Sequence, residues 1–437
     1  MVEESVEGER TLDQMNINEL RALAREKGLD HTGKKPDILA RLQAPVLGPI
    51  ETQLQASRAE IASYRGDRVI GVDAGAYQTK VFDSRGNVVV VRNLVADLLP
   101  GRGIRGKVEA EGGRVFEDGD RNVVLGDDVV KFLPYVALES VRSPVKEPGK
   151  LADDLGVYER VVPFALSLLG TPLQEDERVY VAVLVPGEAE ASYRTGLKNQ
   201  LLRLSHVDGK RVRVDGVRSV PEAFAEGLAI LSASEYLPKN AVLNTGHRTS
   251  DVAVMLGDEP LPQNLRTVHV GGHDVTLAFE KYLRAALDDA GYNDVRLTPE
   301  QVHRLKEANL HLFTEGARPH FPSVDAREVE VPVGWGRTDR LKMKEGVDAP
   351  YRELVEAVAP KVAGLLKQHP VENLYVAGGN VTRGAEALLR YTLANLPSKD
   401  RVDVANVYRV SDAMAGVVGA VLHDIRHGYK GRQRTVV

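Results

Sequence analysis

The chain has 437 residues, 43% of them hydrophobic and 27% charged, which predicts two or three folded domains and excludes a disordered, collagen-like or coiled-coil protein. Its 57 basic residues against 62 acidic ones leave a net charge of −5 at pH 7, so any contact with nucleic acid has to be local. The absence of cysteine excludes disulfides, thiolate metal sites and cysteine nucleophiles.

The first ten residues are polar and acidic, without the basic start and the apolar run of a secretory signal. No segment of the sequence approaches the ~18 consecutive apolar residues that span a bilayer. We therefore expect a cytoplasmic protein that does not contact membranes.

Residues 11–43 predict two short helices joined by a basic turn. Apolar residues recur at helical spacing up to Leu23, and Gly28 is typical of a position just beyond a helix end. A second helix is expected from Pro36, because the first turn of a helix does not need the missing N–H. The basic turn at 31–35 opens onto the N-terminus of that helix, where free N–H groups and the helix dipole favour a phosphate.

This segment resembles the SAP domain, a short helix–turn–helix module that binds DNA. The matching positions are Glu19-Leu20, Gly28-Leu29, Gly33, Lys35 and Arg41-Leu42. The N-terminal domain of the Rho terminator and related modules have a similar pattern and also contact nucleic acid. The resemblance implies DNA binding through residues 11–43, and the side chains expected to contact phosphates are Arg21, Arg25, Lys34, Lys35 and Arg41.

An alternative interpretation of this segment is a two-helix module that docks on a protein. Six basic and five acidic residues give the segment a net charge of only +1. Contacts with a few phosphates give weak, salt-sensitive binding, so several modules side by side would bind DNA far better than one.

Residues 44–67 contain Pro45, Gly48 and Pro49, followed by a polar stretch of helical character at 51–64. We expect this segment to be a linker that lets the front module sample DNA without being fixed to the rest of the chain.

From residue 68 onward the pattern changes to apolar strands separated by Gly- and Asp-containing turns. The expected elements are strands at 68–73, 78–83 and 88–92, a helix at 151–169, a strand at 179–185, a helix at 221–234, and strands at 241–245, 251–256 and 265–270. A strand meander therefore occurs twice, which indicates an internal duplication. We expect lobe I at 68–240 and lobe II at 241–425, with a ligand in the cleft between them.

The first turn of the first meander, D-A-G-A-Y-Q-T-K, carries the groups that suit a magnesium-bound phosphate. Asp73 can hold waters of the metal, Gly75 lets the backbone approach, and Lys80 neutralises charge. A single D-x-G sequence is more often an ordinary turn, so the assignment depends on two further turns. The second meander has N-T-G-H-R-T-S-D at 244–251, and a later strand runs into the glycines at 378–379, where a flat base can lie against the backbone.

In this order, the three turns resemble those of the superfamily of actin, sugar kinases and heat-shock-chaperone ATPases, and most closely prokaryotic actins of the ParM type. The resemblance covers residues 68–425 and implies an α/β, actin/ribonuclease-H-like fold in two lobes that binds ATP or ADP with Mg²⁺. The residues it places at the nucleotide are Gly75, Ala76, Tyr77, Lys80, Gly246, His247, Arg248, Thr249, Gly271, Gly272, Lys306, Gly378, Gly379 and Asn380.

The resemblance also implies three catalytic residues. Glu222 follows a proline in the helix that crosses between the lobes, where bacterial members use this glutamate to orient the attacking water. Asp73 would hold the metal through water, and Asn244 begins the second phosphate loop. These assignments predict a Mg²⁺-dependent ATPase.

The sequence departs from the family pattern at both loops. Asn244 stands where the family has a metal-directing Asp, so hydrolysis is expected to be slow or to depend on Asp73 and Glu222. Ala76 removes a hydroxyl contact to phosphate, Arg248 can restore charge near the γ-phosphate, and His247 is either functional or a surface turn residue. The sequence has no Walker A motif, which excludes P-loop phosphate binding.

Together these patterns predict an actin-like protein that forms nucleotide-dependent filaments and is coupled directly to DNA, in plasmid or DNA segregation or positioning. The alternative is a non-polymerising, chaperone-like or reactivase-like nucleotide switch, which Asn244 favours. A sugar or small-acid kinase is disfavoured by the DNA module. The basic tail at 426–437 is either a second DNA contact or a solvated terminus.

Overall fold

The computed structural model forms two units, Met1–Thr52 and Gln53–Val437, which are described separately. The residues that it describes are 16–26, 34–35, 49–101, 103–118, 120–144, 154–189, 191–231, 240–297, 301–302, 304–306, 328–334, 337–343, 349–378, 402, 404 and 406–428.

In the first unit, helix α1 (Ile17–Glu26) lies within the segment expected to be helical. Asn16 fixes its start, because its side-chain oxygen accepts hydrogen bonds from the N–H groups of residues 18 and 19 at 2.9 and 3.1 Å. In return, the Glu19 carboxylate accepts from the N–H of Asn16 at 2.6 Å, which completes a reciprocal cap. Leu20 is fully buried. The helix expected from Pro36 lies outside the described residues.

Helix α3 (Pro49–Ser63) crosses the boundary between the units, and most of it belongs to the second one. Leu54 and Ile61 lie two helical turns apart on one face and are both buried. Between them, the Ser57 hydroxyl donates to the carbonyl oxygen of Ala229 at 2.8 Å. This face therefore belongs to the core of the second unit.

Two ion pairs add to this packing. Arg58 contacts Asp412 at 2.8 Å, and Arg426 contacts Glu60 at 2.7 Å. The expectation of a free linker over 44–67 is corrected for residues 53–63, because their apolar face and charged side chains have partners on the body. The basic tail expected from Arg426 also begins later, since that residue lies in the last turn of a helix.

Lobe I is built on a six-stranded sheet with the order β3-β2-β1-β7-β9-β8. Its strands are β1 (Arg68–Ala74), β2 (Gln78–Asp83), β3 (Val88–Arg92), β7 (Glu177–Val185), β8 (His206–Val207) and β9 (Lys210–Pro221). Helices α6 (Tyr158–Ser167) and α7 (Ala191–Leu202) pack on this sheet and complete its core. Helix α6 is shorter than the helix expected at 151–169.

Lobe II is built on a five-stranded sheet with the order β12-β11-β10-β15-β16. Its strands are β10 (Asn240–Thr245), β11 (Ser250–Val254), β12 (Leu265–Val268), β15 (Asn373–Ala377) and β16 (Asn406–Arg409). Helix α11 (Ala349–Gln368) packs on this sheet, and α9 (Gly272–Asp289) packs on α11.

The two sheets repeat one topology. In each, a three-stranded antiparallel meander pairs its first strand in parallel with a later strand, β1 with β7 and β10 with β15. The predicted duplicated α/β architecture is therefore confirmed. Every strand expected from the sequence in the described part is present, with ends shifted by at most two residues.

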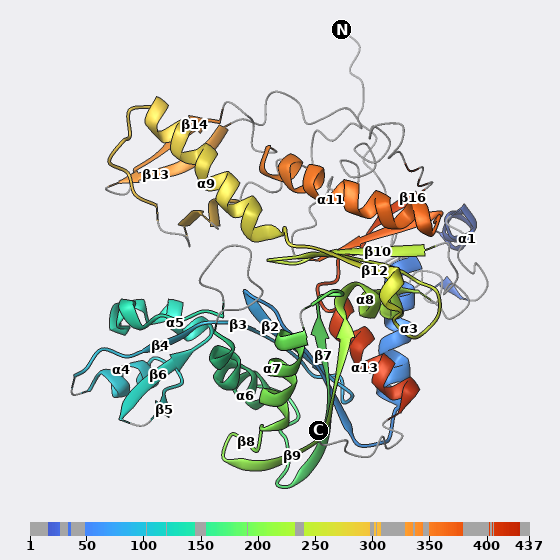
Figure 1. The fold of residues 1–437 in the computed structure, drawn as a ribbon, viewed down its shortest axis with the longest axis horizontal. Helices are drawn as coiled ribbons and strands as arrows, with labels where there is room; N and C mark the ends of the chain where they lie inside the picture. The colour runs from blue at the N-terminus through green and yellow to red at the C-terminus, as the bar shows by residue number, and fades with distance from the viewer. Residues whose placement is uncertain are drawn as a thin grey trace. The chain divides into compact units, whose positions relative to one another are not determined.

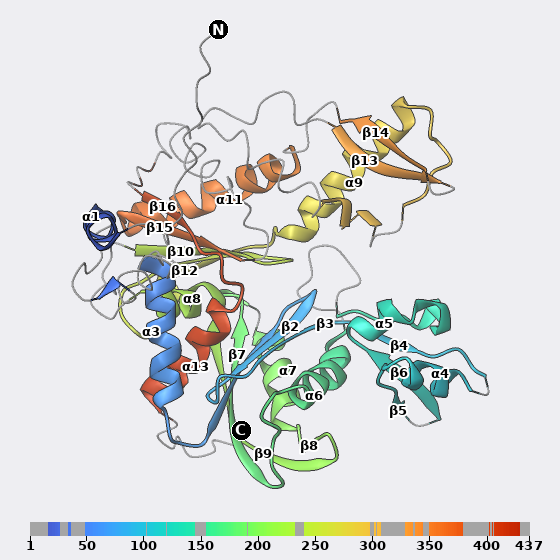
Figure 2. The same cartoon turned by 180° about the vertical axis from the view of Figure 1, so that it is seen from behind.

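Two helices lie between the sheets, α8 (Glu222–Ile230) and α13 (Ala415–His427) (Figures 1 and 2). Helix α8 contacts β7 and β9 of lobe I as well as β10 and β11 of lobe II. It crosses α13 so closely that a Cβ atom on Gly419 would lie 1.7 Å from the carbonyl oxygen of Ala225. Only glycine permits this crossing.

Each lobe also carries a small extra part that the sequence patterns did not predict. In lobe I this part holds β4 (Val95–Asp97), β5 (Phe116–Asp118), β6 (Arg121–Leu125), α4 (Ile104–Ala110) and α5 (Asp127–Lys131), with its own hydrophobic core (Figure 1). In lobe II the hairpin of β13 (Glu328–Gly334) and β14 (Arg337–Lys342) packs with α9. Short 3₁₀ helices occur at Leu133–Tyr135, Leu138–Ser140, Leu155–Val157 and Pro262–Asn264.

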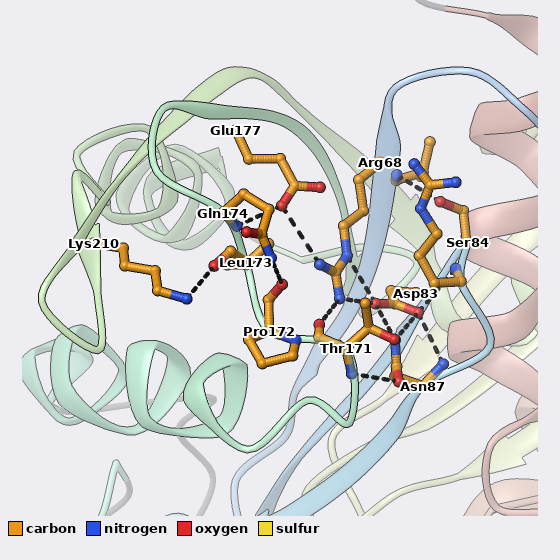
Figure 3. Close-up of polar contacts among 12 residues, drawn as sticks. Arg68, Asp83, Ser84, Asn87, Thr171, Pro172, Leu173, Gln174, Glu177 and Lys210 are labelled. Atoms are coloured by element: carbon orange, nitrogen blue, oxygen red, sulfur yellow. Dashed lines mark hydrogen bonds and ion pairs between the residues drawn. The ribbon is translucent and has the colours of Figure 1, made fainter.

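A buried polar network closes the end of the β1–β2 hairpin that lies away from its turn (Figure 3). The Arg68 guanidinium donates to the Asp83 carboxylate, 2.9 Å from Nε, and to the carbonyl oxygen of Thr171 at 2.6 Å. Glu177 lies 3.6 Å from the same guanidinium. Asp83 also accepts from the backbone N–H and the side-chain amide of Asn87, so both members of the buried pair have several hydrogen-bond partners.

None of the helices in the described part of the chain combines the length and the hydrophobicity needed to cross a bilayer.

Candidate functional site

One cleft in the second unit brings the two predicted phosphate loops together. It is lined by the turn between β1 and β2, by the turn between β10 and β11, by the first turns of α8 and α13, and by the end of β15. The predicted residues that line it are Asp73, Gly75, Ala76, Tyr77, Lys80, Glu222, Asn244, Gly246, His247, Arg248, Thr249 and Gly378. Sequence segments separated by more than 100 residues thus meet at one place.

The first loop is organised around an acid–base pair. Asp73 at the end of β1 lies directly opposite Lys80 of β2, and Lys80 Nζ is 3.0 Å from Asp73 Oδ2. The Asp73 carboxylate raises the pKa of Lys80, so the lysine stays charged although it is largely buried. The loop therefore presents one fixed cation next to an acidic group.

Side chains behind the loop fix the position of Gly75. Its carbonyl oxygen accepts hydrogen bonds from the Asn93 amide and from the Tyr158 hydroxyl, the latter at 3.1 Å. Asn93 is itself held by the Thr79 hydroxyl at 2.6 Å. These hydrogen bonds hold the Gly75 backbone in place where it lines the cleft.

The second loop begins at Asn244, which contacts the predicted catalytic glutamate. The side-chain NH₂ group of Asn244 donates to Glu222 Oε2 at 3.1 Å. The side-chain oxygen Oδ1 of Asn244 is buried without a hydrogen-bond partner among the described residues. Burial, and next the negative charge of Asp73, raise the pKa of Glu222 well above its usual value. The amide thus orients a carboxyl group that tends to keep its proton.

Glu226 is a cleft residue that the sequence analysis missed. It lies one helical turn after Glu222 on α8, and burial raises its pKa to about 8. Its Oε2 atom is also buried without a hydrogen-bond partner among the described residues. The i, i+4 spacing of two glutamates on an otherwise apolar helix was the available signal.

Asp251, at the end of the second loop, joins the two lobes. Its carboxylate accepts hydrogen bonds from the Thr249 hydroxyl at 3.0 Å, from the Thr267 hydroxyl, and from the backbone N–H of Gly187 at 2.8 Å. Gly187 belongs to the loop that follows β7 in lobe I. In the same loop, Glu188 exchanges hydrogen bonds with Thr267, at 2.9 and 2.8 Å.

His247 is half-buried between aromatic rings and is not an exposed turn residue. Its ring centroid lies 5.5 Å from that of Tyr77 in the first loop and 5.5 Å from that of His273 at the start of α9. The two phosphate loops therefore touch through Tyr77 and His247.

Glycines let two backbone segments approach the second loop. Gly378 has a φ of +103°, and a Cβ there would lie 2.3 Å from the carbonyl oxygen of Thr245. A Cβ on Gly271 would lie 2.7 Å from the carbonyl oxygen of Gly246, and the N–H of Gly272 donates to that same oxygen at 3.0 Å. Gly271 and Gly272 thus support the loop from behind and do not line the cleft.

Other predicted binding residues lie elsewhere or outside the described part. Lys306 is buried against α9, where its Nζ donates to the Thr276 hydroxyl at 2.8 Å, and it is not part of the cleft lining. Gly379 and Asn380 lie outside the described residues.

The donor set of the cleft fits a nucleotide with a divalent cation. Three carboxyl groups, from Asp73, Glu222 and Glu226, line the cleft together with Lys80, and their charges raise the pKa of the lysine. Together with the unpartnered Asn244 oxygen, these oxygen atoms are hard ligands of the kind that Mg²⁺ and its bound waters prefer. Lys80, Arg248 and the loop amides are suited to phosphate oxygens.

Of the predicted DNA-contacting side chains, three are described. Arg21 is half-buried on α1, Lys34 is exposed and Lys35 is half-buried. Arg25 lies on α1, but its side chain is outside the described part of the structure, as is the whole of Arg41.

Comparison with known proteins finds matches for both the N-terminal segment and the body of the chain. A SAP domain model matches residues 11–44. The MamK double helical filament subunit is 20% identical, with a TM-score of 0.59, and the match covers 82% of this chain and 98% of that one. The archaeal actin homologue Ta0583 is 14% identical with a TM-score of 0.54, over 82% and 98% of the two chains.

Two further solved structures have the same coverage. A non-polymerisable quadruple mutant of pCBH ParM is 15% identical with a TM-score of 0.52, and a non-polymerising MamK variant bound to AMPPNP is 19% identical with a TM-score of 0.51. No curated protein matches the chain in a sequence search. Since these sequence identities are low, the structural similarity shows the fold alone. The chain therefore joins a SAP domain at residues 11–44 to a body with the actin-like fold.

Proposed function

We propose that the protein is an actin-like ATP-binding protein that assembles into nucleotide-dependent filaments and holds DNA directly through its SAP domain. The observation that carries the proposal is the meeting of the two loops, 73–80 and 244–249, with Gly378 in a single cleft between duplicated lobes. The DNA would be a plasmid or another replicon that is segregated or positioned.

ATP is the ligand that best suits this cleft. Lys80 and the backbone amides of both loops would bind the phosphates, and the base would lie against the backbone at Gly378, which lines the cleft after β15. The MamK variant that shares the fold is bound to AMPPNP, which supports nucleotide binding by this chain. Bound Mg²⁺ would neutralise the developing phosphate charge, with Asp73 holding its waters.

For hydrolysis, Glu222 would orient the attacking water. Its carboxyl group is fixed by the Asn244 amide at 3.1 Å, and it has to lose a proton that burial and neighbouring carboxyls stabilise. Both features predict slow turnover, since a base is most effective when its pKa lies near the working pH.

Assembly would convert weak DNA contacts into strong ones. The SAP module has a net charge of only +1 and would neutralise few phosphates. Subunits that repeat along a filament present many modules at once, so the second and later contacts become intramolecular. Filament formation by MamK, which has the same fold, supports this step.

Sedimentation and electron microscopy with ATP, ADP and AMPPNP, each with and without DNA, test the proposal. We expect filaments with ATP or AMPPNP and co-pelleting of DNA with them. No filaments under any nucleotide, well above micromolar protein, would remove the filament function.

The DNA contact has a separate test. The double variant Lys34→Glu and Lys35→Glu is expected to lose DNA co-pelleting while it still polymerises. Lys107→Glu with Lys281→Glu is a matched control, because it makes the same charge change at two exposed lysines of the body. Equal DNA binding by both double variants would contradict the role of the SAP domain.

A second candidate function is a non-polymerising nucleotide switch that binds DNA or a protein with little turnover. Asn244 favours it, because the amide replaces a carboxylate and contacts Glu222. ATP binding without filaments and with little phosphate release would support this alternative.

A further inference from the structure

A second cluster of chemically active side chains lies away from the nucleotide cleft. His423 and His427 are four residues apart on α13, so they share one helix face, and their ring centroids are 4.5 Å apart. Glu259, in the turn between β11 and β12 of lobe II, extends its carboxylate to both rings. Among the described residues, this is the one group with three potential metal ligands close enough to share an ion.

We propose that Glu259, His423 and His427 form a binding site for a divalent transition-metal ion, most suitably Zn²⁺. The Glu259 carboxylate lies 3.2 Å from His427 Nδ1 and 3.6 Å from His423 Nε2. Zinc bonds of about 2.0–2.1 Å in a tetrahedral site place neighbouring ligand atoms roughly 3.3 Å apart. The observed separations lie close to this value, so an ion could be bound with small side-chain movements.

Burial supports a ligand at this place. The His423 side chain is 4% exposed, and its Nε2 atom, which faces Glu259, has no hydrogen-bond partner among the described residues. The Nε2 atom of His427 is also buried without one, and the Asp258 carboxylate lies 3.6 Å from it. Since a buried polar atom without a partner is costly, an ion that binds the imidazoles would stabilise the site.

Two charged groups beside the site, Arg218 and Asp258, contact the imidazole nitrogens that do not face Glu259. Arg218 lies 3.5 Å from His423 Nδ1 on the side away from Glu259, and its guanidinium contacts Asp424 at 3.1 Å. Two imidazoles and a carboxylate favour Zn²⁺, Co²⁺ or Ni²⁺ over Mg²⁺ and Ca²⁺, which prefer oxygen ligands alone. The site therefore differs in chemistry from the cleft.

The ion would join the lobes. Its histidines lie on α13, which packs on the lobe I sheet, and its carboxylate lies in a lobe II turn. Helix α13 begins at the cleft, where Gly416 and Val417 contribute to the lining. The eleven residues from there to His427 span roughly 16 Å, so the metal site would hold the lobes together at the end away from the nucleotide.

Isothermal titration of the untagged full chain with Zn²⁺, after chelator treatment, tests the proposal. A polyhistidine tag has to be absent because it binds the same ions. We expect one Zn²⁺ per chain, lost or weakened at least tenfold in Glu259→Gln and in His427→Gln. His206→Gln is the matched control, since His206 is exposed and lies outside the cluster.

Co²⁺ provides a second readout, because its visible spectrum reports the ligand geometry. We expect a spectrum of a site with nitrogen and oxygen ligands that Zn²⁺ displaces and that Glu259→Gln abolishes. Glu259 is mostly exposed in a turn, so this variant should fold even where replacement of the buried His423 does not. No binding by the wild-type chain, or equal binding by the Glu259, His427 and His206 variants, would overturn the proposal.

Discussion

The two ends of the β1–β2 hairpin carry the same type of interaction with opposite consequences. At the outer end, Arg68 and Asp83 form a buried pair in which the guanidinium and both carboxylate oxygens are hydrogen-bonded (Figure 3). At the cleft end, Lys80 and Asp73 form a pair at 3.0 Å, but Glu222 and Glu226 line the same cleft and also raise the pKa of the lysine.

The same two strands therefore carry a structural ion pair at one end and a candidate binding site at the other. In the outer network the charged groups are hydrogen-bonded to neighbouring protein groups, so this network needs no ligand. The cleft holds an excess of carboxyl groups and, among the described residues, buried oxygen atoms without partners, which a nucleotide and its cation would satisfy. Four substitutions test the comparison, from the largest expected effect to the smallest.

Replacing Arg68 by Met should destabilise the fold most. It leaves the Asp83 carboxylate buried without its cation, and breaking such a pair costs about 3–5 kcal/mol. Urea unfolding followed by circular dichroism measures the loss. The control is Lys210→Met at the edge of the same network, where one hydrogen bond to a carbonyl oxygen is lost, at a cost of about 1 kcal/mol. Similar losses in both variants would contradict the structural role of the buried pair.

Replacing Lys80 by Met should leave the fold intact and reduce ATP affinity. We expect at least tenfold weaker binding, or about 1.4 kcal/mol, because the only lysine among the described cleft residues is removed. Fluorescent-nucleotide titration measures the change. Arg85→Met, which removes an exposed cation at the next turn of the same meander, should bind ATP like the wild type. Unchanged affinity in the Lys80 variant would place the nucleotide elsewhere.

Replacing Asn244 by Asp should raise the rate of phosphate release by about tenfold, because a carboxylate directs a metal better than an amide does. The same change puts a second carboxyl group about 3 Å from Glu222 and should lower the stability of the nucleotide-free protein. Phosphate release and thermal unfolding are measured together. Asn244→Ser removes the amide without adding charge, so faster release in that variant as well would show that the new carboxylate is not the cause.

Replacing Glu226 by Gln should change how stability depends on pH. Burial raises the pKa of Glu226 to about 8, above its ordinary value of 4.5, so the folded state holds this proton more tightly than the unfolded state does. Its contribution is fully present below pH 4.5 and is lost as the pH rises through about 8. The Gln variant should therefore gain stability relative to the wild type as the pH rises from 5 to 8, measured by denaturation. A constant difference between the two proteins would contradict this assignment.

The sequence predicted the parts of the site that depend on local chemistry. Asp73 and Lys80 were recognisable because a strand, a glycine turn and a second strand place them opposite each other. Glu226 was missed because it belongs to no loop motif and enters the cleft only through the packing of α8 between the lobes. Lys306 was assigned to the nucleotide, but its buried hydrogen bond to Thr276 arises from tertiary packing that the pattern does not contain.

The parts of the fold that the sequence did not predict also depend on tertiary packing or are too short to show a periodic pattern. The long strands of both meanders are apolar on two faces and were predicted with nearly correct ends. Strands β4 and β5 have three residues each, too few for a periodic pattern. Helix α3 looks polar in sequence, because only Leu54 and Ile61 bury large apolar side chains and the ion pairs that hold it have partners more than 350 residues away.

The anchored helix α3 limits where the SAP domain can go. The domain match ends at residue 44 and α3 begins at Pro49, so five Cα steps, at most about 18 Å of extended chain, connect them. One turn of DNA measures about 34–36 Å, which is longer than this connection. In the proposed filament, so short a connection would make the spacing between neighbouring SAP domains follow the repeat of the subunits that carry them.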